Sequence, residues 1–133
     1  MVITDGRDNS SVTSLADLAK AAQQSGVIIY SVGLLALDDA RSEITRAKSS
    51  LRDLATATGG ESYFPGDLAG VDRIAYRVAR DIRNQYTIGY TPSNQEMDSS
   101  YRKIRIAVNA RRGLTARTRS GYFATSDQSS PGR

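Results

Sequence analysis

The chain has 133 residues, the length of one domain or of part of a larger one. It contains no cysteine and no histidine, which excludes disulfides, thiolate chemistry, a serine–histidine triad and a His-ligated zinc site within these residues. The net charge of +4 is unevenly placed, because residues 1–100 carry 10 Lys and Arg against 13 Asp and Glu, whereas residues 101–133 carry 8 against 1.

A short apolar strand opens the chain. Val2-Ile3-Thr4 runs straight into Asp5-Gly6, which places a carboxylate at a turn. Open α/β sheets bind ligands just beyond the carboxyl ends of their strands, and Mg²⁺ prefers oxygen ligands. Asp5 is therefore a candidate metal ligand, and Asp8 is a candidate helper that acts through water. The alternative for both is an ordinary loop carboxylate.

The next two elements are a helix and a buried strand. Ser14 and Asp17 have the spacing of a capping box, which predicts a helix that begins after Ser14 and stops at Ser25-Gly26. Its expected apolar face is made of Leu15, Leu18, Ala19 and Ala22. Val27–Leu35 is almost continuously apolar, as is typical of a strand in a parallel sheet that is covered on both faces.

The middle of the chain predicts two helical segments and a third strand. Residues 38–48 are expected to be partly helical. Ser50 and Asp53 repeat the capping spacing and predict a separate short helix that stops at Gly59-Gly60. Residues 61–64 then read as a strand.

The clearest helix follows at 69–84, with an apolar stripe opposite a row of arginines. With it, the predicted order becomes β-α-β-α-β-α. That order calls for right-handed crossovers and a mostly parallel, doubly wound α/β sheet with helices on both faces.

The last third of the chain changes to successive strands without helices, predicted at 86–92, 101–109 and 113–123. The second and third of them would form an antiparallel hairpin through a turn at 109–113. Along the second, Ile104, Ile106 and Val108 alternate with polar residues and are expected to face inward. Along the first, Tyr86, Ile88 and Tyr90 share a face and are expected to pack against the last helix or the hairpin.

The outer face of this hairpin is predicted to be basic, through Lys103, Arg105, Arg117 and Arg119. These four residues are candidate ligands for phosphates, acidic glycans or an acidic protein. The alternative is a solvated sheet face whose charges also discourage edge pairing.

Several stretches together resemble a known family. VITDGRDNSS, VIIYSVGL and LRDLATATGGESYF resemble the C-terminal half of a von Willebrand factor type A domain. RIAYRVARDIRNQYTIGYTPSN and YRKIRIAVNARRGLTARTRSGYF resemble the bacterial VWFA-related proteins. The resemblance extends to about residue 123, and the spaced combination carries it rather than any single motif.

The resemblance implies a partial domain. Residues 1–91 would be the C-terminal half of the α/β unit, 92–124 its antiparallel extension, and 125–133 a loose tail. The family's metal-ion-dependent adhesion site combines a D-x-S-x-S motif, a threonine from a later loop and an aspartate in the strand-TDG turn. Only Asp5 matches. We therefore expect Mg²⁺ or Mn²⁺ in a full-length parent whose second half this chain represents, and no tight metal binding by these residues alone.

The function implied is non-catalytic: a metal-assisted protein-interaction or adhesion module whose protein partner supplies a carboxylate to the metal. An extracytoplasmic location is expected from the resemblance, and self-association is expected through the unpaired edge of the first strand. One alternative is a fragment of a Mg²⁺-dependent hydrolase or phosphoryl-transfer enzyme, which the lack of a glycine-rich phosphate loop disfavours. The other is a basic nucleic-acid-binding module, although no aromatic side chains interleave with the charges of the hairpin strands. No apolar stretch approaches the ~20 residues of a membrane span.

Overall fold

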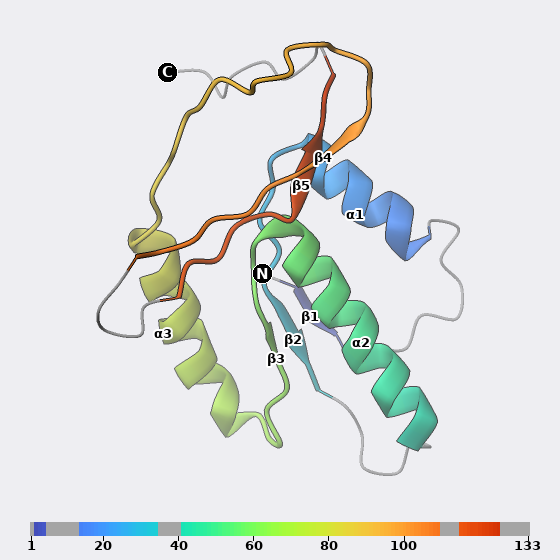
Figure 1. The fold of residues 1–133 in the computed structure, drawn as a ribbon. Helices are drawn as coiled ribbons and strands as arrows, with labels where there is room; N and C mark the ends of the chain where they lie inside the picture. The colour runs from blue at the N-terminus through green and yellow to red at the C-terminus, as the bar shows by residue number, and fades with distance from the viewer. Residues whose placement is uncertain (1, 5–13, 35–40, 110–114, 126–133) are drawn as a thin grey trace.

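The computed structural model describes residues 2–4, 14–34, 41–109 and 115–125. Within them the chain is a mixed α/β structure with three helices and two small sheets (Figure 1). In chain order the elements are β1 (Val2–Thr4), α1 (Leu15–Gln24), β2 (Ser31–Gly33), α2 (Arg41–Thr58), β3 (Ser62–Tyr63), α3 (Ala69–Arg83), β4 (Tyr101–Lys103) and β5 (Gly121–Phe123). The predicted alternation of strands and helices through α3 is confirmed.

The first sheet is parallel and has the order β1-β2-β3. Thr4, the last residue of β1, is paired with Gly33, the last residue of β2. The strand predicted at 27–35 is much shorter than expected, because Val27 and Ile28 are 52% and 39% exposed and only residues 31–33 pair. Val32 is fully buried and lies at the centre of the core.

The capping-box spacing predicts the start of α1 correctly and the start of α2 wrongly. The Ser14 hydroxyl accepts a hydrogen bond from the Asp17 amide at 3.1 Å, as the spacing predicts. The predicted second cap at Ser50 is wrong, because a single helix runs from Arg41 to Thr58. No glycine or proline interrupts that stretch, so one continuous helix costs little, and the first glycine after it is Gly59.

The helices differ in how well their apolar faces are covered. In Figure 1, α1 and α2 lie to the right of the parallel strands and α3 lies to the left, beside β3. Leu54 and Ala55 of α2 are buried, whereas Leu15 and Leu18 of α1 are 39% and 45% exposed, so the predicted apolar face of α1 is buried mainly through Ala22. On α3 only Gly70 and Val78 are buried.

The segment after α3 departs most from the prediction. Residues 86–92 form no strand, and Tyr86, Ile88 and Tyr90 are 91%, 68% and 59% exposed. The expectation that these side chains pack against the last helix or the hairpin is therefore wrong for Tyr86 and Ile88, whereas Tyr90 reaches Tyr122 of the hairpin. Alternating apolar residues favour a strand only where a neighbouring strand supplies backbone partners, and the structure gives this segment none among the described residues.

The second sheet is the predicted antiparallel hairpin, shortened. β4 pairs with β5 in a register that places Tyr101 opposite Phe123 and Lys103 opposite Gly121. The predicted turn at 109–113 falls mostly on residues outside the described part. The inward face is smaller than predicted, because Ile104 is half-buried while Ile106 and Val108 are 40% and 45% exposed.

The hairpin packs at the amino end of the parallel sheet. The Ser120 amide donates to the Ala57 carbonyl at 3.3 Å, at the end of α2 and ahead of β3. The buried amide of Gln23, on α1, donates to the Ala57 carbonyl at 2.8 Å and to the hydroxyl of Ser120 at 3.2 Å. Gln23 thus ties α1, α2 and the hairpin together through a satisfied buried side chain.

Candidate functional site

The carboxyl end of the parallel sheet is the place where the sequence predicts a metal ligand. The backbone of β1 ends at Thr4, level with Gly33 at the end of β2. Asp5 follows Thr4 in the sequence, but Asp5 and Asp8 lie outside the described residues. Their proposed roles as metal ligand and water-mediated helper therefore stay predictions.

The described residues do not supply a ligand set for a metal. Across residues 2–4, 14–34, 41–109 and 115–125, no three carboxylates gather in a way that could hold a metal ion. One carboxylate without further oxygen ligands is a poor site for Mg²⁺, because Mg²⁺ on one or two carboxylates is usually also held by substrate phosphates and waters. The described part of the chain thus does not fit a complete cation site.

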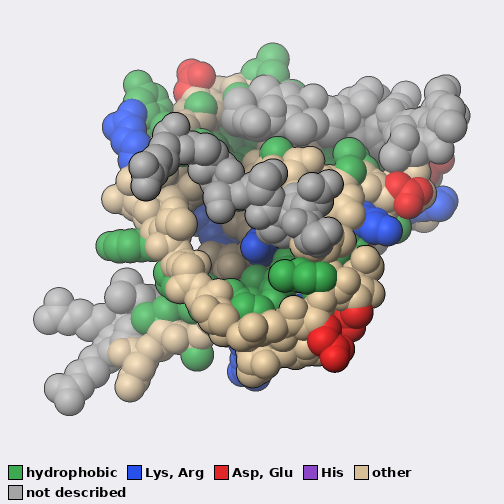
Figure 2. Space-filling model, turned by 90° about the horizontal axis from the view of Figure 1, so that it is seen from above, with side chains coloured by type: hydrophobic (Ala, Val, Ile, Leu, Met, Phe, Trp, Pro, Cys, Tyr) green, Lys and Arg blue, Asp and Glu red, His purple; other side chains and the backbone are tan. Residues whose placement is uncertain are grey.

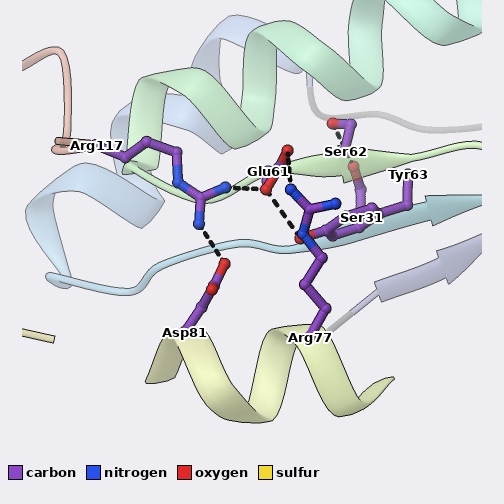
Figure 3. Close-up of polar contacts among 7 residues, drawn as sticks. All are labelled: Ser31, Glu61, Ser62, Tyr63, Arg77, Asp81 and Arg117. Carbon is purple, nitrogen blue, oxygen red and sulfur yellow. Dashed lines mark hydrogen bonds and ion pairs between the residues drawn. The ribbon is translucent and has the colours of Figure 1, made fainter. Parts of the chain in front are cut away.

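The best-formed polar cluster lies at the other end of the sheet, and we call it the arginine clasp: Arg117, Glu61, Asp81 and Arg77 (Figure 3). The Arg117 guanidinium lies between two carboxylates, with one nitrogen on Glu61 and the other on Asp81. Arg77, from α3, approaches the second oxygen of Glu61 at 3.7 Å. Glu61 directly precedes β3 and Asp81 is on α3, so Arg117 joins the hairpin to both elements.

The clasp extends toward the sheet through Tyr63. The Tyr63 hydroxyl donates to Glu61 at 2.9 Å, and the Arg77 guanidinium lies 5.6 Å from the centre of its ring. Burial, and then the hydrogen bond to Glu61, raises the pKa of Tyr63 above its usual 10.0. Next to it, the hydroxyls of Ser31 and Ser62 share a 2.7 Å hydrogen bond that links β2 and β3.

This raised pKa gives a testable pH dependence. The unfolded chain ionises Tyr63 near pH 10, whereas the folded chain holds the proton to higher pH. The stabilisation is therefore fully present below pH 10 and is lost as pH rises through the higher folded pKa. We expect Tyr63→Phe to lose less stability than the parent between pH 9 and pH 11, measured by urea unfolding. Parallel losses in the two proteins would contradict this role of Tyr63.

The four basic residues predicted as one ligand-binding face differ in their contacts, and their predicted role in ligand binding stays a prediction. Lys103 and Arg105 are exposed. Arg117 is turned to Glu61 and Asp81, and Arg119 lies over the ring of Tyr122, 5.7 Å from its centre. Since Arg117 is already neutralised within the molecule, the basic face has less charge for a phosphate backbone than the sequence suggests.

Sequence reasoning missed Arg102. Its side chain is only 15% exposed and donates to the backbone carbonyls of Asn94 and Glu96, while pairing with Asp98 at 3.6 Å. These bonds fasten the irregular segment after α3 onto β4. No periodic signal marks such a residue, because its partners are carbonyls of a segment without regular structure.

The aromatic side chains near Arg102 were also missed as a group. Tyr90, exposed as part of its segment, reaches Tyr122 on β5, and their hydrogen bond raises the pKa of Tyr90 above 10.0. Tyr101 and Phe123 contact each other across the hairpin, with ring centres 5.1 Å apart and ring planes tilted by 58°. Figure 2 looks down on this end of the molecule and shows hydrophobic and basic side chains gathered around a hollow.

Comparison with family models, curated proteins and solved structures gives no match. In the described part of the chain, no helix combines the length and apolar character needed to cross a membrane.

Proposed function

We propose that the chain is a non-catalytic protein-interaction module that contacts an acidic partner at the carboxyl end of the β1–β2–β3 sheet. The observation that carries the proposal is the register of this sheet. It ends β1 at Thr4, level with Gly33 at the end of β2, and the next residue in the sequence is an aspartate. Open parallel sheets bind ligands just beyond the carboxyl ends of their strands. The resemblance to von Willebrand factor type A domains supports the same edge, within a partial doubly wound fold.

The position of the hairpin supports this choice of edge. The bonds from Ser120 to Ala57 and from Arg117 to Glu61 place the hairpin at the amino end of the parallel strands. The amino end is thus used for internal packing. The proposal assigns the partner to the opposite end.

The role of Asp5 is limited to what one carboxylate can do. As the single family ligand that this sequence matches, it would hold a divalent cation weakly and leave coordination positions for an acidic group of the partner. A Mg²⁺ or Mn²⁺ ion would supply the positive charge that joins the two carboxylates. Because Asp5 is the only residue of this sequence that matches the family's ligands, tight binding of the metal by the chain alone is not expected.

The test is cation-dependent binding of a labelled peptide. We expect a Gly-Asp-Gly peptide to bind the chain in millimolar Mn²⁺, measured by fluorescence polarisation, and to be released by a chelator. A Gly-Asn-Gly peptide, which lacks the charged oxygen ligand, is expected to bind at least several-fold more weakly.

Two variants locate the effect. Asp5→Asn is expected to abolish the cation dependence, whereas Asp53→Asn, a matched change on the exposed side of α2, is expected to leave it intact. Peptide binding that is unchanged by the chelator or by Asp5→Asn would overturn the proposal.

A further inference from the structure

A cavity lies between the irregular segment after α3 and the outer side of β5. It has a volume of about 220 Å³ and is open on one side. Its walls include Tyr90, Met97, Arg102, Arg119, Tyr122 and Phe123. Drug-sized ligands usually occupy larger pockets, so this one suits a small molecule.

The wall formed by the irregular segment is held in place from within the molecule. Arg102 holds the carbonyls of Asn94 and Glu96, and the Ser99 amide donates to the Ala124 carbonyl at 2.9 Å. The cavity is therefore bounded by fixed backbone on the side of residues 94–99, although that segment has no helix or strand.

The two arginines of the cavity differ in their interaction partners. Arg102 is matched internally by Asp98 and by the two carbonyls. Arg119 lies over the ring of Tyr122, 5.7 Å from its centre, and among the described residues no carboxylate pairs with it. A guanidinium held over an aromatic ring has N–H groups at its edge, in its own plane, that can form paired hydrogen bonds to a carboxylate.

The other side chains that line the cavity determine which kind of ligand body fits beside the carboxylate. Tyr90, Met97 and Phe123 give the cavity an apolar and aromatic wall next to the Arg119 guanidinium. The thioether of methionine adapts to ligands of irregular shape and makes favourable contacts with aromatic rings. We propose that this cavity binds small monocarboxylates that carry an apolar or aromatic body, with Arg119 holding the carboxylate.

This site is separate from the one in the proposed function. It is built by the hairpin at the amino end of the sheet, and it requires neither a cation nor Asp5. A negative result for one proposal therefore does not contradict the other, because the two are tested with different probes: the Gly-Asp-Gly peptide with Mn²⁺, and N-acetylphenylalanine.

The probe is N-acetylphenylalanine, titrated into the ¹⁵N-labelled chain and followed by ¹H–¹⁵N NMR. We expect saturable shifts at the amides of Met97, Ala124 and Thr125, which border the cavity. N-acetylphenylalanine amide, which has the same ring and no charge, is expected to bind about tenfold more weakly, since a charge-assisted pair is lost.

Variants test the assignment of the carboxylate to Arg119. Arg119→Gln is expected to weaken the acid about tenfold and to leave the amide unchanged. Arg119→Lys, which keeps the charge without the planar fork, should lie between the parent and Arg119→Gln. Arg105→Gln, a change at an exposed hairpin arginine outside the lining, is the matched control and should bind like the parent.

Three results would overturn the proposal. They are the absence of saturable shifts, shifts that fall away from the cavity, and equal affinity for the acid and the amide. The NMR spectrum of each variant reports whether the variant is folded. If Arg119→Gln does not fold, Arg119→Lys still tests the proposal.

Discussion

Replacing Gly60 with alanine is expected to lower the free energy of unfolding by at least about 3 kcal/mol, or to prevent folding. A Cβ atom at this position would lie 1.9 Å from the carbonyl oxygen of Ile29 and 2.6 Å from its carbonyl carbon. These are backbone atoms, so no change of rotamer relieves the clash. Either the end of α2 or the entry to β2 must move.

The consequence extends to the parallel sheet. The Gly60 amide donates to the Ala55 carbonyl at 2.9 Å, and the next residue, Glu61, accepts from the Ser31 amide at 3.1 Å. A displacement of the backbone at Gly60 and Glu61 separates β2 from β3 and also moves the Glu61 carboxylate of the arginine clasp. A single methyl group therefore disturbs both the core and the hairpin attachment.

Gly89→Ala is the matched control, because nothing lies within 4 Å of its Cβ position and no positive φ is found there. It should change the free energy of unfolding by less than about 0.5 kcal/mol. Urea unfolding followed by far-UV circular dichroism measures both variants. A Gly60→Ala protein that unfolds at the midpoint of the parent would show that the junction between α2 and β3 is not as described.

Replacing Arg117 with methionine is expected to lower the free energy of unfolding by about 1–2 kcal/mol. The change keeps the apolar stem and removes the charge that separates Glu61 from Asp81. The estimate lies below the cost of breaking a fully buried pair, because the Arg117 side chain is 36% exposed and water screens the interaction. The estimate exceeds the contribution of a lone surface pair because both Glu61 and Asp81 lose the guanidinium between them, although Arg77 remains near Glu61.

Salt separates this electrostatic effect from lost packing. Raising the salt concentration screens the ion pairs of the parent, so the difference between the parent and Arg117→Met should shrink as salt increases. Arg105→Met is the control: it removes an exposed arginine of the same hairpin for which the described residues provide no ion pair. A salt-independent difference, or an equal loss in the control, would contradict the role assigned to the arginine clasp.

The order of elements through α3 could be predicted from sequence because each signal was local. Ser14 and Asp17 are three residues apart, and their hydrogen bond needs no partner from elsewhere in the chain. The same spacing at Ser50 misled, because a capping residue is needed only where a helix starts, and the helix already extended back to Arg41. A local capping pattern thus supports the presence of a helix more reliably than it locates a boundary inside a helical stretch.

The candidate sites were harder to predict because their partners are distant in sequence. Arg117 meets Glu61 and Asp81, 56 and 36 residues away, so its alternation with apolar neighbours on the hairpin carried no sign of either. Tyr86 and Ile88 illustrate the converse: alternation predicted a strand, but the described fold provides no neighbouring strand. Arg117 of the predicted basic face belongs to the arginine clasp, and Arg119 belongs to the wall of the cavity. Both contacts depend on the packing of the hairpin at the amino end of the sheet, which the sequence pattern does not indicate.

The location of cation binding tests the account most directly, and paramagnetic line broadening by Mn²⁺ reports it residue by residue. We expect Mn²⁺ to broaden the amides of Thr4 and Gly33 first, because Thr4 precedes Asp5 in the sequence and Gly33 is paired with Thr4 on the neighbouring strand. We expect Asp5→Asn to remove that selectivity. Broadening centred instead on Glu61 and Asp81, or unchanged in Asp5→Asn, would contradict the assignment of the carboxyl end of the sheet as the contact for an acidic partner.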